Sequence, residues 1–114
     1  MCGIAGYIGK EPISKERINK TLSLMKSRGP NCQKFVKDRF EDNEVALLHS
    51  RLSIIDIDKR SDQPFSKDNL LIIFNGEIYN FIEVRKNLVN KGHNFQTNSD
   101  TEVIIETYKR YQEK

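Results

Sequence analysis

The amino-acid sequence predicts a single α+β domain, in which helices cover an antiparallel or mixed sheet. Three observations support this fold class. Short apolar segments bounded by glycine and turn residues are typical of strands, and apolar residues at helical spacing follow three helix-start signals. The elements also come in the order strand, helix, several strands, helix, strand, helix. With 114 residues, the chain has room for one domain and a modest core.

The first predicted strand, residues 2–8, is small and apolar, and its glycines permit close approach of another backbone. The first predicted helix begins after Ser14, a good N-cap residue, and places its apolar residues between 18 and 25 on one face. It ends at Arg28-Gly29-Pro30, because a proline ring cannot continue a helix.

The middle of the chain predicts further strands. Gln33–Arg39 and Glu44–Ser50 are expected to pair around a turn at Asp42-Asn43. Leu70–Phe74 is a continuous apolar run, and the Asn75-Gly76 pair directly after it is the strongest short turn signal in the chain. Taken alone, this pair predicts a β-hairpin.

The C-terminal part predicts two helices. Asn80 with Glu83 is a variant of the capping box, and it opens a helix that ends at Gly92. A short strand is expected at His93–Thr97. Ser99-Asp100-Thr101-Glu102 is a second capping box, and its helix is expected to bury Val103, Ile104 and Tyr108.

Charge and composition exclude several classes of protein. The net charge of +3 comes from 19 basic and 16 acidic residues that are scattered along the chain, so no nucleic-acid partner is expected. No stretch approaches the roughly 18 apolar residues that span a bilayer, and the N-terminus does not resemble a signal peptide. We therefore expect a cytoplasmic protein without a membrane partner. The two cysteines and two histidines lack the spacing of metal ligands, so no metal is expected.

The position of Cys2 is the most informative feature of the chain. A cysteine in a buried strand is usually an inert small hydrophobe. Removal of Met1 would instead place a free α-amino group beside the thiol. Because that amine can accept the thiol proton near neutral pH, one residue would supply both nucleophile and base.

A thiol that attacks a carbonyl needs donors directed at the developing oxyanion. Asn75 could supply its side-chain amide and Gly76 its backbone N–H. The alternative is that the pair only forms the turn of a hairpin.

A small zwitterionic substrate needs charged partners. Arg51 is suited to a carboxylate, and Glu77 and Asp100 are suited to an ammonium group. Each has a structural alternative: Arg51 could pair with Asp56, Glu77 could be solvated, and Asp100 could cap a helix.

Five segments in order, MCGIAGYIG, RGP, HSRLSIIDIDKRSDQPF, FNGEIYNF and SDTEVII, carry a family resemblance. Together they resemble the glutaminase domain of class II glutamine amidotransferases, which are N-terminal nucleophile hydrolases. The likeness is greatest to the asparagine synthetase branch, and it extends from Met1 to about Tyr108. It implies a four-layer αββα sandwich, and the helical pattern that continues to Lys114 suggests a C-terminally truncated glutaminase domain over residues 1–114.

The resemblance also implies roles for individual residues. Cys2 would attack the side-chain amide of L-glutamine and form a glutamyl thioester, releasing ammonia and then glutamate, with Asn75 and Gly76 as oxyanion donors. The Arg28-Gly29-Pro30 loop would help to close the site. Substrate-binding roles fall on Arg51, on Glu77 and Asp100, and on the backbone of Leu52, Ile54 and Ile55.

The family implies no cofactor for this chain, since ATP and magnesium belong to the synthetase domain that it lacks. Asn31 stands where the family usually has aspartate, which removes a carboxylate from that loop. The alternative function is a non-catalytic remnant that binds glutamine or pairs its exposed sheet edge as a homo-oligomer. Another amidotransferase branch would share the nucleophile and differ in the ammonia acceptor.

Overall fold

A computed structural model gives the fold, and it describes residues 2–52 and 62–112. Three strands form an antiparallel sheet in the order β1-β3-β2: β1 (Gly3–Gly9), β2 (Cys32–Phe40) and β3 (Asn43–Arg51). The central strand β3 pairs along its whole length with β2 and over Glu44–Ser50 with β1. All three strands were predicted from the sequence.

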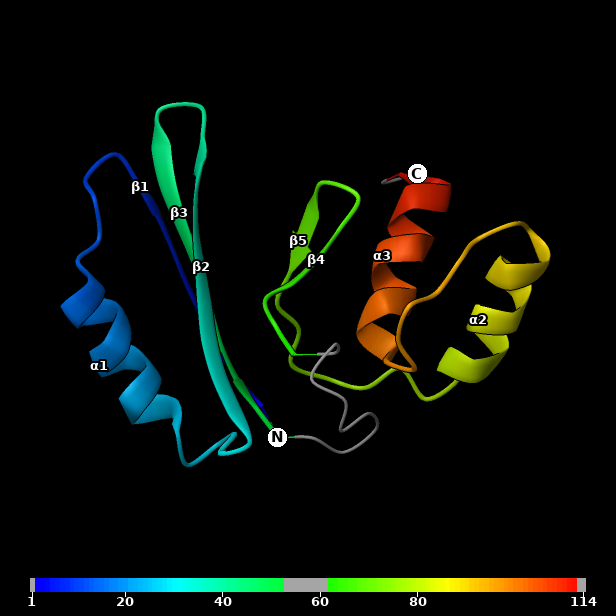
Figure 1. Cartoon of the computed structure of the whole chain (residues 1–114), viewed down its shortest axis with the longest axis horizontal. Coiled ribbons are helices and arrows are strands. Elements are labelled where there is room, and N and C mark those ends of the chain that lie inside the picture. Colours follow the sequence, from blue (N-terminus) through cyan, green and yellow to red (C-terminus); the bar gives the residue numbers. More distant parts are fainter. Residues whose placement is uncertain (1, 53–61, 113–114) are drawn as a thin grey trace.

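Helix α1 (Lys15–Met25) packs on one face of this sheet (Figure 1). Its start confirms the prediction, because the Ser14 side chain accepts a hydrogen bond from the backbone N–H of Arg17. Ile18 and Leu22 are buried against β3, where they form a core cluster with Ala46 and Leu48.

Strands β4 (Phe65–Lys67) and β5 (Leu70–Ile72) form an antiparallel hairpin. Its turn is Asp68-Asn69, and both residues have positive φ. Asp and Asn tolerate this left-handed conformation, which a two-residue hairpin turn of the primed type requires.

The hairpin predicted at Asn75-Gly76 is therefore wrong. Strand β5 ends at Ile72, and the chain continues through residues 73–80 into a helix rather than a partner strand. Gly92 is the only described glycine with positive φ, so Gly76 does not adopt a primed-turn conformation. The turn signal was misleading because no strand comes after it.

Helices α2 (Phe81–Asn90) and α3 (Asp100–Tyr111) pack against each other on the side of the hairpin away from the large sheet (Figure 1). Asn80 is the N-cap of α2 as predicted, but its side chain forms no capping hydrogen bond, so the capping box with Glu83 is absent. Gly92 lies just beyond the helix with φ of 94°.

The strand predicted at residues 93–97 is absent, and these residues form a loop. Glu102 explains the difference. Its carboxylate accepts hydrogen bonds from the backbone N–H groups of Gln96 and Thr97, which a partner strand would otherwise satisfy. Glu102 therefore does not complete the predicted capping box, although Ser99 does cap α3 through the N–H of Thr101.

The face of α3 that is buried differs slightly from the prediction. Val103 is buried as expected and Ile104 is half-buried, whereas Tyr108 is 41% exposed. Ile105 takes the second fully buried apolar position.

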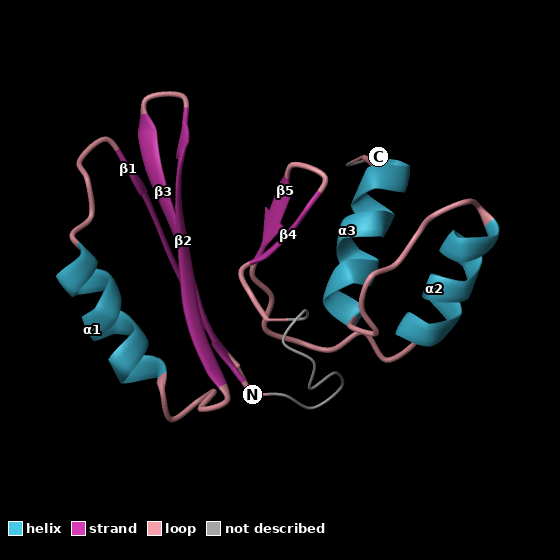
Figure 2. Cartoon of the chain, in the orientation of Figure 1, coloured by secondary structure: helices cyan, strands magenta, loops and turns pink. Residues whose placement is uncertain are grey.

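Helices lie on the two outer sides of the molecule and strands lie between them (Figure 2). Across the long direction the order is α1, the three-stranded sheet, the β4-β5 hairpin, α3 and α2 (Figure 1). This mixed fold with antiparallel sheets agrees with the predicted α+β class. None of the described helices is long and apolar enough to cross a membrane.

Candidate functional site

Cys2 lies immediately before β1, at the end of the large sheet. Its sulfur accepts a hydrogen bond from the backbone N–H of Leu52, with 3.3 Å between Sγ and N. This contact results from the register, because Gly3 pairs with Ser50 and the next residues outward are Cys2 on one strand and Arg51 on the other. The structure thus brings together two residues, Cys2 and Leu52, that the sequence assigned to one site.

The loop after α1 is fixed against the same end of β3. A Cβ on Gly29 would lie 2.2 Å from the carbonyl oxygen of Ser50, so the two backbones are in direct contact. The Ser50 hydroxyl donates to the carbonyl of Gly29 at 2.6 Å, and the N–H of Asn31 donates to the carbonyl of Arg51 at 3.0 Å. Arg28 reaches the carbonyl of Cys2 with its Nε at 3.4 Å. The Arg-Gly-Pro loop therefore borders the cysteine, as predicted.

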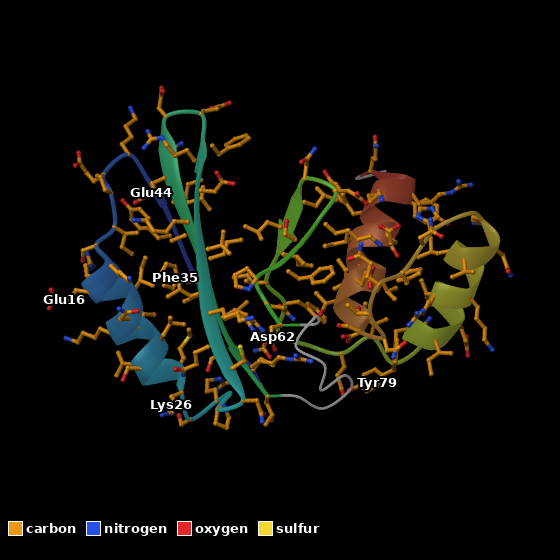
Figure 3. The ribbon with its side chains drawn as sticks, in the orientation of Figure 1. Glu16, Lys26, Phe35, Glu44, Asp62 and Tyr79 are labelled. Carbon is orange, nitrogen blue, oxygen red and sulfur yellow. The ribbon has the colours of Figure 1, made fainter. Side chains whose placement is uncertain are left out.

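Arg51 forms a buried ion pair that the sequence did not predict. Its Nη1 lies 2.5 Å from Oδ1 of Asp62, and only 8% and 7% of the two side chains are exposed. Asp62 also accepts from Lys34, whose Nζ is 3.3 Å from Oδ2. Figure 3 shows Asp62 in the middle of the molecule. Asp56, the partner considered from the sequence, lies outside the described residues.

The surroundings of Asp62 keep its carboxylate ionised. Burial alone would raise the pKa of Asp62, but hydrogen bonds from Arg51, Cys32 and Lys34 outweigh burial and hold this pKa below its ordinary value. Burial raises the pKa of the Cys32 thiol, and the Asp62 carboxylate raises it further, so this thiol is neutral near neutral pH.

The predicted oxyanion residues lie in the segment between β5 and α2. Asn75 is half-buried, and Gly76 and Glu77 are exposed. Among the described residues, the Asn75 side chain has no hydrogen-bond partner. The segment is anchored on its far side by Asp100, whose Oδ2 accepts from the N–H of Ile78 at 3.1 Å. Asp100 is not the cap of α3, since Ser99 has that role.

The predicted site residues thus fall into two groups. Cys2, Arg51 and Leu52 meet at the end of the sheet, and Asn75, Gly76, Glu77 and Asp100 gather near the start of α3. Within the described ranges no hydrogen bond joins Cys2 directly to Asn75 or Gly76. Met1, Ile54 and Ile55 lie outside the described residues.

Two buried polar residues, His49 and Gln63, connect the groups, and sequence reasoning did not select them. His49 contacts the carbonyl of Phe74 through Nε2 at 3.2 Å, and Gln63 accepts from the N–H of Phe74 through Oε1. Both lie within the motif HSRLSIIDIDKRSDQPF, and membership in this motif was the only sequence signal that could have selected them. In the part of the chain that the structure describes, no group of three or more His, Cys, Asp or Glu side chains could hold a metal ion.

Comparison with known proteins identifies the family of the chain. A family model described as "Glutamine amidotransferase domain" matches residues 1–114. The chain is 40% identical to asparagine synthetase [glutamine-hydrolyzing] 1 of Bacillus subtilis, over all of this chain and 18% of that protein. It is 37% identical to asparagine synthetase [glutamine-hydrolyzing] 1 of Arabidopsis thaliana, over 97% of this chain and 19% of that protein.

A third relative is a putative asparagine synthetase [glutamine-hydrolyzing] 2 of Methanocaldococcus jannaschii. It is 34% identical over 96% of this chain and 24% of its own length. The chain thus spans about a fifth of the length of the curated relatives it matches. With a family model matched over its entire length, the chain belongs to the glutamine amidotransferase domain family.

Proposed function

We propose that this chain is the glutaminase part of an asparagine synthetase-like amidotransferase and hydrolyses the side-chain amide of L-glutamine with Cys2 as nucleophile. The observation that carries the proposal is the placement of Cys2 at the edge of the sheet, with its sulfur held by the N–H of Leu52 beside the buried Arg51. Family membership and the relatives' names support the same substrate.

Before the reaction, hydrolysis of the Met1–Cys2 peptide bond removes Met1 and exposes the α-amino group of Cys2. This amine accepts the thiol proton, and the sulfur attacks the side-chain amide carbon of glutamine. The carbonyl oxygen takes up negative charge as the S–C bond forms. The C–N bond then breaks, and the nitrogen leaves as ammonia with the proton from the amine. Water attacks the resulting thioester, giving glutamate and restoring the thiol.

The side-chain amide of Asn75 and the backbone N–H of Gly76 are the proposed donors to the oxyanion. Support comes from the Asn75 side chain, which is half-buried and forms no hydrogen bond with another described residue. Glycine at position 76 also leaves its N–H unobstructed by a side chain.

Arg51 is the proposed partner of the glutamine α-carboxylate. A guanidinium has five N–H donors in a planar fork, so it can bind a ligand carboxylate while it contacts Asp62. Glu77 and Asp100 are the proposed partners of the ammonium group. In this proposal the backbone of Leu52, Ile54 and Ile55 forms the pocket wall.

The finer fold belongs to the proposal as well. The order of layers in Figure 1 supports an αββα sandwich, with the β4-β5 hairpin as part of its second sheet. We further propose that the ammonia serves an acceptor site in another part of a longer protein. The relatives' name, asparagine synthetase [glutamine-hydrolyzing], supports this proposal.

The test is the intact mass of the purified chain before and after exposure to a glutamine analogue that carries a diazoketone. We expect loss of Met1 and addition of one adduct, which excess L-glutamine suppresses. The Cys2→Ala variant should gain no adduct, whereas the matched Cys32→Ala variant should be labelled like the unmodified chain. Retention of Met1, or labelling at Cys32 instead, would contradict the proposal and favour a non-catalytic glutamine-binding or oligomeric remnant.

A further inference from the structure

The backbone of Phe74, directly before Asn75, is held by buried side chains at both its N–H and its carbonyl group, which belong to the peptide groups before and after this residue. Its N–H donates to Oε1 of Gln63 with 2.5 Å between the heavy atoms. Its carbonyl oxygen lies 3.2 Å from Nε2 of His49. His49 is fully buried and Gln63 is 7% exposed. Two buried polar side chains are thus committed to the two peptide groups that flank Phe74 in an irregular segment.

His49 can only act as a donor in this contact. Burial is the main cause that lowers the pKa of its ring, so the ring is neutral near neutral pH. Because a carbonyl oxygen accepts hydrogen bonds, Nε2 must carry the single ring proton, and Nδ1 is left as a buried acceptor without a partner among the described residues. Such a group costs free energy.

Gln63 joins the other peptide group of Phe74, the one that carries its N–H, to the start of α3. Its Nε2 donates to the Thr101 hydroxyl at 3.0 Å while its Oε1 accepts from Phe74, so both ends of the amide are used. The residue before Thr101, Asp100, accepts a hydrogen bond from the N–H of Ile78 through its carboxylate. The segment from Asn75 to Glu77 is therefore anchored at both ends to buried side chains.

We infer that His49 and Gln63 are positioning residues, which fix the two peptide groups on either side of the Phe74 Cα so that Asn75 and Gly76 point at the developing oxyanion. The inference rests on the proposed function. The Phe74 carbonyl carbon is bonded to the nitrogen of Asn75, so fixing this peptide plane restricts the direction in which the next residues project. Donors that are held in place before the reaction lower its barrier most, and a displacement of about 1 Å costs up to a hundredfold in rate.

The experiment compares glutamine hydrolysis by His49→Leu and His49→Gln, with ammonia release divided by the amount of Cys2 that the diazoketone analogue labels. The amide nitrogen of Gln lies where Nε2 of His lies, so it can donate to Phe74, whereas Leu cannot. We expect His49→Leu to lower kcat per labelled site on the order of ten- to a hundredfold, with KM changed by less than about threefold. His49→Gln should recover most of kcat.

Gln63→Met supplies a second variant of nearly unchanged volume, and it should lower kcat per labelled site in the same way. His93→Leu is the distant control, because His93 pairs with Glu106 and does not contact Phe74. It should leave kcat unchanged. Division by labelled sites separates positioning from folding, since an unfolded fraction reduces the number of sites and not the rate at each site.

Each result decides one of the two claims. Equal kcat per labelled site for the unmodified chain, His49→Leu and Gln63→Met would overturn the inference and leave the proposed function standing. Equal losses for His49→Leu and His49→Gln would also overturn it, because the donor would then be irrelevant. An unmodified chain that neither reacts at Cys2 nor releases ammonia would overturn the proposed function, and the inference with it.

Discussion

Arg51 is the residue on which substrate recognition and structure make competing demands. Its guanidinium is buried and already contacts Asp62, which also holds Lys34. Removing one partner of a buried ion pair leaves an uncompensated charge, and such losses cost about 3–5 kcal/mol. A lysine at this position would keep the positive charge but lose the planar fork that can serve two carboxylates.

We therefore predict that Arg51→Lys weakens the binding of L-glutamine. The α-carboxylate contact is made equally before and during the reaction, so KM should rise about tenfold or more while kcat changes little. The measurement is ammonia release as a function of glutamine concentration, with the diazoketone-labelled fraction as the count of sites.

A ligand without the α-carboxylate provides the control for this prediction. Hydrolysis of 4-aminobutanamide should be weak, and its kcat/KM should be similar in the unmodified chain and in Arg51→Lys. An equal loss for both ligands would show that the substitution disturbed the site through Asp62, and the assignment of Arg51 to the carboxylate would be wrong.

The sequence suggests site candidates whose chemistry is visible at their own position. Cys2 was proposed because loss of Met1 would place an amine beside its thiol, and Asn75 with Gly76 because they offer a side-chain amide and an adjacent backbone N–H. Asp62, His49 and Gln63 could not be selected. Their importance comes from partners that are 11, 25 and 38 residues away, for Asp62 with Arg51, His49 with Phe74 and Gln63 with Thr101.

At the scale of elements, the loop after α1 is held by backbone contact rather than by side-chain packing. The Gly29 position leaves no room for a side chain, because a Cβ would lie 2.2 Å from the carbonyl oxygen of Ser50. The obstacle is backbone in the central strand β3, which cannot move without disturbing its pairing on both sides. The loop and the strand end therefore form one unit next to Cys2.

Gly29→Ala is accordingly predicted to destabilise the chain by about 2–3 kcal/mol and to slow labelling of Cys2, because the loop must move away from β3. Gly6→Ala is the matched control. Its Cβ would lie 3.6 Å from the nearest atom, the Ala46 carbonyl oxygen, which is an ordinary contact. Denaturant unfolding of the two variants measures the difference, and similar stabilities would refute the close contact at Gly29.

Elements with local signals were predicted well, and elements that depend on distant partners were not. Helix α1 and strands β1 to β3 carry their own caps, turns and apolar faces. The loop at residues 93–97 has the composition of a strand but lacks a neighbouring strand, and a single carboxylate from α3 satisfies part of its backbone. The Asn75-Gly76 pair was likewise a local signal, and it failed because helix α2, not a second strand, comes next in the chain.

At the scale of the whole molecule, a buried charge cluster joins the β4-β5 hairpin to α3. Lys67 from β4 lies 2.7 Å from Glu102 and 3.6 Å from Glu106. Glu106 also contacts His93 and Lys109, and Lys109 reaches Asp68 in the hairpin turn. Because Glu102 is fully buried, the cluster is stable only while its charges and hydrogen bonds are balanced.

Glu102 makes the stability of this half dependent on pH. Burial alone would raise the pKa of Glu102, but hydrogen bonds from Lys67, Gln96 and Thr97 outweigh it and hold this pKa below the ordinary value of 4.5. The unfolded chain therefore binds the proton more readily than the folded chain. The stabilisation by Glu102 is complete above pH 4.5 and is lost as the pH falls through the lowered folded value.

Glu102→Gln should consequently lower the free energy of unfolding by about 3 kcal/mol near neutral pH, where the ionised carboxylate is replaced by an amide that cannot match its hydrogen bonds. The gap to the unmodified chain should narrow as the pH falls below 4.5, because the protonated carboxyl then resembles the amide. Urea unfolding at a series of pH values measures the gap, with the exposed Glu11→Gln as a control whose curve should match that of the unmodified chain. A gap that stays constant with pH would mean that Glu102 stabilises the hairpin and α3 through packing, and that its ionised carboxylate is not what holds the two together.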